Sequence, residues 1–190
     1  MYRHISRDVH LLVALILLTS CTSPWTSASS PLKTPLPTND TVITLERTVC
    51  FGWCPAYTLT IHGDGQVTYE GYAYVDVEGV RTSNISQSKI HELLYEFGKV
   101  DFFVANEHYS IGATDLPTFF VTLAIGNRQK RIEHYGCDPQ WLTDLEYMID
   151  TVAETEQWIG ENAYQKHEKL NCADFFSRDE VPDQFESPLQ

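Results

Sequence analysis

The first twenty-one residues constrain this chain more than any other segment. A head with Arg3 and Arg7 precedes the apolar run Leu11–Leu18, and two small residues follow before Cys21. This order is typical of a secretion signal, and the run is shorter than the roughly 20 residues that span a bilayer. We therefore expect residues 1–20 to be a cleaved signal, so that the rest of the chain folds in an oxidising compartment.

Cys21 resembles the lipidated cysteine of bacterial lipoproteins, because it directly follows Leu18-Thr19-Ser20. The resemblance implies that Cys21 becomes the mature N-terminus and carries acyl chains such as palmitate, in which each buried methylene contributes about 0.8 kcal/mol. Thr22 stands where lipoproteins of the inner membrane typically have Asp, which implies the outer membrane of a bacterial cell envelope. A signal cleaved without lipidation and a permanent transmembrane helix are the alternatives.

Composition divides the remaining chain into three parts. Residues 21–40 are an expected tether, because twelve of the residues 22–40 are Pro, Ser or Thr and they show no apolar periodicity. Residues 41–160 are the expected domain, which is long enough to bury a core without metal. Residues 161–190 are a mostly polar, acidic C-terminal extension.

The charge balance excludes nucleic acid as a partner. Cleavage of the signal removes Arg3, Arg7 and Asp8, which leaves 11 Lys and Arg against 25 Asp and Glu, so the net charge changes from −13 to −14. Such a chain repels nucleic acid and anionic lipid at long range. We therefore expect contact with the membrane through the lipid on Cys21, and an envelope protein as a further partner.

Alternating apolar residues predict strands joined in hairpins. The turns are favoured by Gly63-Asp64-Gly65 and by Gly126-Asn127, because glycine accepts the positive φ of tight turns. In the first strand Ile43, Leu45 and Arg47 share one face. The expected strands are residues 41–48, 56–62, 66–70, 72–81, 119–125 and 128–135.

Two apolar stripes with helical spacing accompany the hairpins. Ser86 favours the start of a first helix and Gly98 its end, and a second helix is expected from Asp138-Pro139 to Gly160. The stripes are Ile90, Leu93, Leu94 and Phe97, then Trp141, Leu145, Met148, Ile149 and Val152. Both stripes must be buried, so the sequence predicts an α+β fold: an antiparallel sheet from hairpins packed by two amphipathic helices, as a two-layer sandwich.

An even number of cysteines besides Cys21 indicates disulfides in an oxidising compartment. These cysteines are Cys50, Cys54, Cys137 and Cys172, which allow three pairings. Local spacing favours Cys50–Cys54 together with Cys137–Cys172. The short ring would present Phe51 and Trp53 as candidate partner contacts, and Gly52 would supply the backbone freedom that a tight ring requires.

The segment Cys50-Phe51-Gly52-Trp53-Cys54-Pro55-Ala56-Tyr57 resembles the opening motif of a family of secreted bacterial domains of unknown function. That motif is Cys-Phe-Gly-x-Cys-Pro-x-Tyr, and a hairpin with a Gly-Asp-Gly turn follows it. The resemblance covers residues 42–160 and implies the limits of the domain, but it implies no activity. Cys137, Cys172 and the acidic extension lie outside the pattern.

The spacing of Cys50 and Cys54 before Pro55 also resembles the copper site of chaperones with a thioredoxin-like fold. Two thiolates and a histidine would bind Cu(I), so a redox or copper-binding module that uses Cys50 and Cys54 is the alternative function. In that fold the cysteines open a helix, whereas residues 56–62 alternate as a strand. We therefore favour a structural disulfide.

The remaining candidate residues are basic side chains and histidines. Arg128, Lys130 and Arg131 form a basic cluster that protects a sheet edge or contacts an acidic partner. The histidines lack metal-ligand spacing, and we interpret them as polar surface residues; they are His62, His91, His108, His134 and His167. Catalytic sequence motifs are absent, and we expect neither metal nor cofactor. The expected function is that of a non-enzymatic envelope lipoprotein, a tethered domain that binds or scaffolds an unknown ligand.

Overall fold

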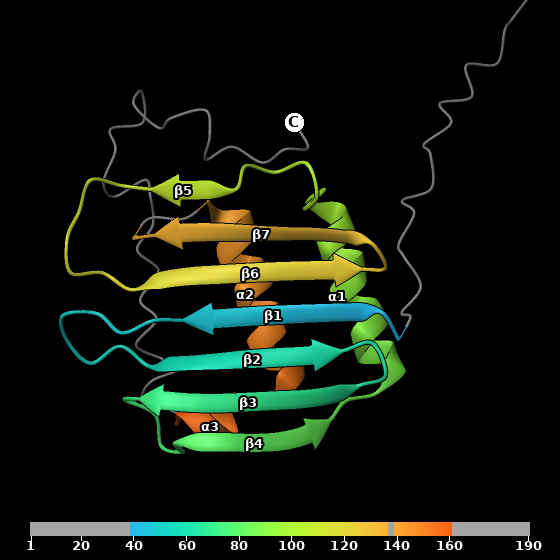
Figure 1. Ribbon diagram of the computed structural model, residues 1–190, viewed down its shortest axis with the longest axis horizontal. Coiled ribbons are helices and arrows are strands. Elements are labelled where there is room, and N and C mark those ends of the chain that lie inside the picture. Colours follow the sequence, from blue (N-terminus) through green and yellow to red (C-terminus); the bar gives the residue numbers. More distant parts are fainter. Residues whose placement is uncertain (1–38, 137–138, 161–190) are drawn as a thin grey trace, which may run out of the picture. The chain divides into compact units, whose positions relative to one another are not determined.

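The computed structural model describes residues 39–136 and 139–160 and confirms the α+β class. Seven strands form one sheet in the order β4-β3-β2-β1-β6-β7-β5 (Figure 1). The strands are β1 (Thr41–Arg47), β2 (Ala56–His62), β3 (Gln66–Ala73), β4 (Gly79–Asn84), β5 (His108–Ser110), β6 (Thr118–Ile125) and β7 (Arg128–Tyr135). The helices are α1 (Gln87–Lys99), α2 (Gln140–Ala153) and α3 (Glu156–Ile159).

Several predicted features lie outside the described residues. They are the signal at residues 1–20, Cys21, the tether up to residue 38, Cys137, Asp138, and the extension 161–190 with His167 and Cys172. Within the described ranges, no helix is long and apolar enough to cross a bilayer.

Both predicted hairpins are present as antiparallel pairs, β2 with β3 and β6 with β7. Their turns contain Gly65 at φ 96° and Gly126 at φ 59°, which is the left-handed region that glycine adopts without steric cost. β1 lies between the hairpins and pairs antiparallel with both β2 and β6. The local turn chemistry therefore determines which neighbouring strands are joined.

β5 corrects the prediction of a purely antiparallel sheet, because it pairs parallel with β7 over His108–Ser110. The chain leaves β4 at one edge of the sheet and passes through α1 before it reaches β5 at the other edge. A crossover that contains a helix can deliver a strand in either direction, whereas a tight hairpin can form only antiparallel pairs. The sheet is therefore mixed.

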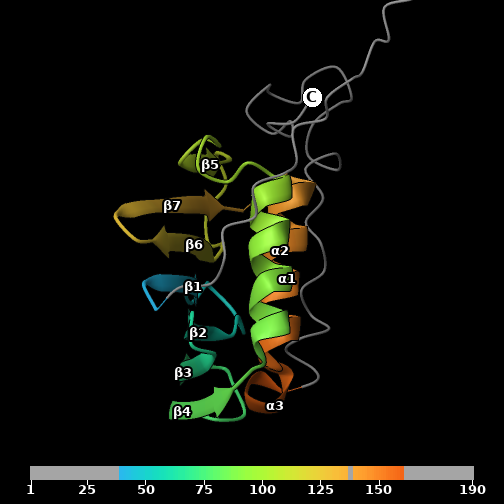
Figure 2. The ribbon, with the colours of Figure 1, turned by 90° about the vertical axis from the view of Figure 1, so that its right-hand side faces the viewer.

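The core lies on the face of the sheet that α1 and α2 cover (Figure 2). Ile43 and Leu45 of β1 point into it and are fully buried. The predicted stripe of α1 is buried throughout, and its residues are Ile90, Leu93, Leu94 and Phe97. In α2 the buried apolar residues are Leu142, Leu145, Ile149, Val152 and Ala153, whereas Trp141 and Met148 are partly buried.

The helix ends differ from those that residue types predict. Ser86 does cap α1, because its hydroxyl accepts a hydrogen bond from the Lys89 N–H, but the helix continues past Gly98. Asp101, at φ 46°, takes the left-handed position that Gly98 was expected to take. The second helix ends at Ala153 instead of near Gly160, because Glu154 at φ 58° turns the chain before α3 begins.

Leu93→Ala tests the core, because Leu93 is a fully buried side chain of α1. We expect the free energy of unfolding to fall by about 2–5 kcal/mol, since the change removes apolar contacts and leaves a cavity. Chemical denaturation followed by circular dichroism measures the midpoint. Glu92→Ala, at an exposed position of the same helix, is the matched control and should leave the midpoint in place. An equal midpoint for both variants would place Leu93 outside the core.

Candidate functional site

A row of large side chains crosses the helix-covered face at one end of the sheet. The strand register pairs Tyr57 of β2 with Arg47 of β1, Arg47 with Phe119 of β6, and Phe119 with His134 of β7. Directly paired residues share a face of a sheet, so all four point toward the helices. Arg47 and Tyr57 are the last pair of the β1–β2 ladder, where the β1–β2 connection leaves the sheet.

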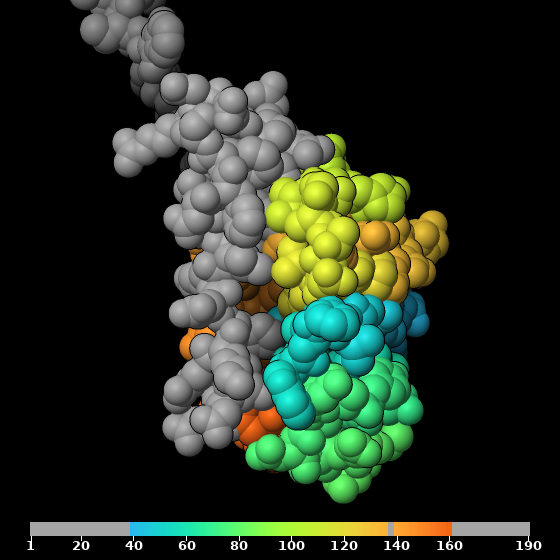
Figure 3. All heavy atoms as spheres, turned by 90° about the vertical axis from the view of Figure 1, so that its left-hand side faces the viewer, coloured from blue at the N-terminus to red at the C-terminus, as the bar shows by residue number. Residues whose placement is uncertain are grey.

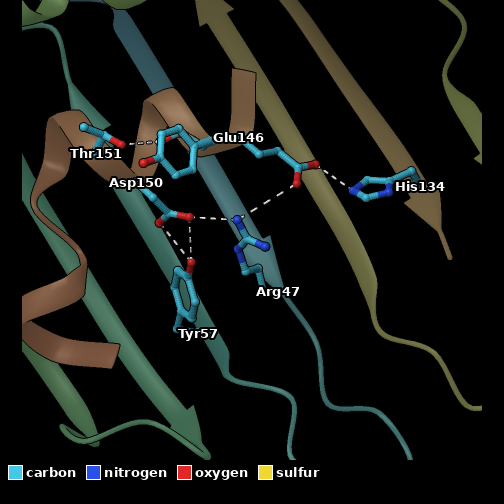
Figure 4. Close-up of polar contacts among 7 residues, drawn as sticks. Arg47, Tyr57, His134, Glu146, Asp150 and Thr151 are labelled. Atoms are coloured by element: carbon cyan, nitrogen blue, oxygen red, sulfur yellow. Dashed lines mark hydrogen bonds and ion pairs between the residues drawn. The ribbon is translucent and has the colours of Figure 1, made fainter. Parts of the chain in front are cut away.

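Helix α2 places two carboxylates against this row (Figure 4). Glu146 and Asp150 are four residues apart and therefore lie on the same face of the helix. Nη2 of Arg47 donates to Oδ2 of Asp150 at 2.7 Å, and the Tyr57 hydroxyl donates to Oδ1 of Asp150 at 2.9 Å. Glu146 lies 4.0 Å from the Arg47 guanidinium, and its Oε1 lies 2.6 Å from Nε2 of His134. We call these five polar residues the buried polar network.

Burial determines the electrostatics of the network, since each of its five members is at most 7 % exposed. Burial raises the pKa of Asp150 above its ordinary value, and Arg47 and the Tyr57 hydroxyl oppose that rise by stabilising the carboxylate. Burial also raises the pKa of Tyr57 well above its ordinary value, so the hydroxyl stays protonated and donates to Asp150. Phe119 completes the packing, because the guanidinium carbon of Arg47 lies 4.7 Å from its ring centre.

The buried polar network fixes the base of the β1–β2 connection. Arg47 ends β1 and Tyr57 lies at the start of β2, so Asp150 binds a side chain on each side of the connection. The carboxylate therefore holds the two strand ends in one position relative to α2. A charged group buried with its partners is costly to separate from them, which makes this base resistant to local opening.

The β1–β2 connection carries two exposed apolar rings. Cys50 and Cys54 form the expected disulfide, with their Cα atoms 5.6 Å apart. Phe51 and Trp53, which lie in the ring that this disulfide closes, are 88 % and 80 % exposed. The Phe51 N–H donates to the carbonyl oxygen of Asp115 in the β5–β6 connection at 3.1 Å. The short ring is therefore attached to a second connection of the domain.

Tyr74, in the β3–β4 connection, contacts the short loop that the disulfide closes. Its side chain meets Trp53 edge-to-face with the ring centres 5.4 Å apart. The backbone of Tyr74 adopts φ 57°, a left-handed conformation that is rare for a residue other than glycine and that concentrates at functional sites. Figure 3 shows the three connections side by side at the surface, with the β1–β2 connection in cyan. We call Val49, Phe51, Trp53 and Tyr74 the aromatic end.

The predicted basic cluster contacts its own domain. Arg131 pairs with Glu46 at 2.6 Å, Lys130 lies 3.4 Å from Glu107, and the guanidinium of Arg128 lies 4.0 Å from the ring centre of Phe103. β5 pairs only with residues 133–135 of β7, so the cluster lies along the part of β7 that β5 leaves uncovered. Edge protection and contact with an acidic partner both stay predictions.

The buried polar network was not predicted from the sequence, and the interpretation of His134 as a surface residue is wrong. His134 is 2 % exposed, because its strand position faces α2 instead of solvent. A signal was present: Arg47 is in phase with Ile43 and Leu45, and Glu146 and Asp150 are in phase with the apolar residues of α2. Charged residues at core positions indicate buried pairs.

An acidic hollow opens beside the network where α2 meets α3. Its volume is about 550 Å³, and it is lined by Asp76, Asp150, Thr151, Glu154, Glu156, Gln157 and Gly160. Among the residues that the structure describes, no group of three or more His, Cys, Asp or Glu side chains is arranged to hold a metal ion. His91 and His108 are exposed and His62 is half-buried, so none of them adds to the network.

Comparison with protein families matches residues 41–153 to a domain of unknown function, DUF6438. The match covers more than half of the chain, which therefore belongs to this family. The predicted membership of an uncharacterised domain family is thus confirmed, and the matched range includes the aromatic end and the buried polar network. None of the curated proteins compared with the chain matches it.

Asp150→Asn tests the network, because it removes the anion nearest to Arg47. We expect a loss of about 3–5 kcal/mol in the free energy of unfolding, since a buried guanidinium loses its principal countercharge. Asp144→Asn, at an exposed position of the same helix, is the matched control. The double variant Arg47→Met with Asp150→Leu should lose less stability than Asp150→Leu alone, because the guanidinium of Arg47 is then no longer buried without its countercharge. Equal denaturation midpoints for Asp150→Asn and the control would contradict the role of the ion pair.

Replacing Cys50 and Cys54 with serine tests the disulfide. The ring closes over a sequence separation of 4, so it removes little entropy from the unfolded chain. We expect a smaller loss of stability than Leu93→Ala causes, measured by the same denaturation assay. Peptide mapping without reductant should recover Cys50 linked to Cys54. A fragment that links Cys50 to Cys137 or Cys172 would contradict the local pairing.

Proposed function

We propose that this protein is a non-enzymatic lipoprotein of the bacterial cell envelope whose tethered domain binds a partner through the aromatic end. The observation that carries the proposal is the exposure of Phe51 and Trp53 at 88 % and 80 %. Burying an apolar side chain such as Phe is worth about 1.5–3 kcal/mol relative to leaving it in water. Two large exposed rings in one short loop are therefore a surface that gains free energy on contact.

The rigidity of the aromatic end supports a role in binding. The disulfide closes the loop of residues 50–54, and the carbonyl oxygen of Asp115 accepts a hydrogen bond from the Phe51 N–H. The Tyr74 ring contacts the Trp53 ring. Below the ring, Asp150 holds both strand ends. Groups that are ordered before contact lose less conformational entropy when they bind, so a fixed pair of rings binds more tightly than a mobile pair.

The proposed anchor is lipid on Cys21, followed by the Pro-, Ser- and Thr-rich tether. An extended chain of this kind advances about 3.1 Å per residue, so residues 22–40 reach at most about 60 Å. The proposal treats the domain as the predicted two-layer sandwich, in which the helices cover one face of the sheet and leave the aromatic end free. Location in the outer membrane is part of the same proposal and rests on Thr22.

A redox or copper-binding module that uses Cys50 and Cys54 is the second candidate. The favouring observation is that the cysteine pair lies in the β1–β2 connection and encloses two exposed side chains, Phe51 and Trp53. Both sulfurs would have to be reduced before they could bind Cu(I) as thiolates. Thiol titration of the unreduced protein and metal analysis of protein purified without chelator distinguish this candidate from a structural disulfide.

A photo-reactive amino acid at position 53, introduced into the full chain in cells, tests the binding role. We expect covalent adducts from position 53 in the envelope fraction, and far fewer from position 147, where Tyr147 is exposed on α2. In a parallel culture, Cys21→Ala should release the chain from the membrane fraction or block its processing. Equal adduct yields at positions 53 and 147 would contradict the binding role. A Cys21→Ala variant that is processed and fractionates like the wild type would contradict the anchor.

A further inference from the structure

We infer that the partner of the aromatic end is the interface of a lipid bilayer that is poor in anionic lipid. The inference rests on the proposed function and names what the exposed rings bind. Trp and Tyr favour the boundary between headgroups and acyl chains, where an apolar ring and a polar edge are both accommodated, and Phe inserts its apolar ring at the same depth. Three of the four residues of the aromatic end are of these types.

The shape of the aromatic end favours insertion into a soft surface. Phe51 and Trp53 project from the domain, as their exposure requires, and they do not line the acidic hollow between α2 and α3. Trp53 and Tyr74 meet with an interplanar angle of 70°, so their rings do not form the flat platform on which a sugar ring would stack. Projecting rings need no partner groove of matching shape when the partner is a fluid interface.

The charge distribution points to neutral lipid. Residues 48–55 contain no charged side chain, although the chain as a whole carries a net charge of −13. The adjacent connections, residues 74–78 and 111–117, contain Asp76, Glu78 and Asp115 and no Lys or Arg. The apolar tip could therefore enter the interface while these carboxylates stay in water, and an anionic surface would repel them.

The expected tether is long enough to let this end reach the membrane that holds Cys21. The chain enters β1 at Thr41, and the aromatic end follows the opposite end of that strand. A seven-residue strand spans about 23 Å at about 3.3 Å per residue. This length is well below the reach of residues 22–40, so the domain can turn its aromatic end toward the bilayer while Cys21 stays inserted.

The anchor makes a weak contact effective. A few rings at an interface contribute modest affinity, but tethering converts their binding into an intramolecular event with a high local concentration. The contact would therefore set the orientation of the domain at the surface, and the lipid on Cys21 would supply the attachment. In this arrangement the membrane contact uses neither the acidic hollow nor the sheet face opposite α1 and α2.

Depth-dependent fluorescence quenching tests the inference on the lipidated full chain. Trp25→Phe is the parent, which removes the tryptophan of the tether and leaves Trp53 as the exposed one, since Trp158 is buried and Trp141 partly buried. The parent is reconstituted in phosphatidylcholine vesicles whose acyl chains carry bromine. We expect strong quenching that Trp53→Phe abolishes, that Phe51→Ser reduces, and that Tyr147→Ser leaves unchanged. Added phosphatidylglycerol should lower the quenching, and salt should restore it.

Several outcomes would overturn the inference. They are an absence of quenching in the parent, equal quenching with and without Trp53, and stronger quenching with anionic lipid. Protein-sized adducts from position 53 in cells, together with an unquenched Trp53 on vesicles, would leave the proposed binding role standing and make the partner a protein. Equal adducts at positions 53 and 147 together with an unquenched Trp53 would reject both the binding role and the lipid interface as its partner. Lipid adducts and quenched Trp53 support both.

Discussion

The aromatic end of this domain depends on the hydrogen bonds that the carboxylate of Asp150 accepts. This carboxylate binds Arg47 at the end of β1 and Tyr57 at the start of β2, so a single helical residue determines how the connection between these strands leaves the sheet. The sequence separations of 103 and 93 residues show that this is a tertiary constraint. The position from which the β1–β2 connection leaves the sheet follows from it.

Local patterns predicted the parts of the fold that are determined locally. Alternation located the two hairpins, and the stripe from Ile90 to Phe97 located α1. Two kinds of feature were not predicted. β5 pairs with a strand that follows it in the chain, so its parallel direction depends on the α1 crossover and on no local pattern. Asp101 and Glu154 take left-handed conformations for which residue type gives little warning. The disulfide of the candidate site was predictable from spacing, whereas the network required knowledge of which strand faces which helix.

The buried polar network and the aromatic end differ in how far their side chains are exposed to water. The buried polar network removes five polar side chains from water and pairs them with one another. The aromatic end leaves apolar rings in water, above a base that the network holds in place. A binding surface made of apolar rings tends to collapse onto its own domain unless the backbone prevents it. Here the disulfide, the Asp115 hydrogen bond and the left-handed Tyr74 provide that restraint.

The ion pair of Arg47 with Asp150 also has a consequence for how the chain avoids misfolding. A slip of one residue along β1 would move every side chain of that strand to the other face of the sheet. Arg47 would then point toward solvent, and Asp150 would be buried without the cation that balances it. Burying an uncompensated charge costs several kcal/mol, a penalty that an apolar pair at this position would not impose. The ion pair therefore lowers the stability of the incorrectly aligned sheet relative to the native one, and so favours the native register.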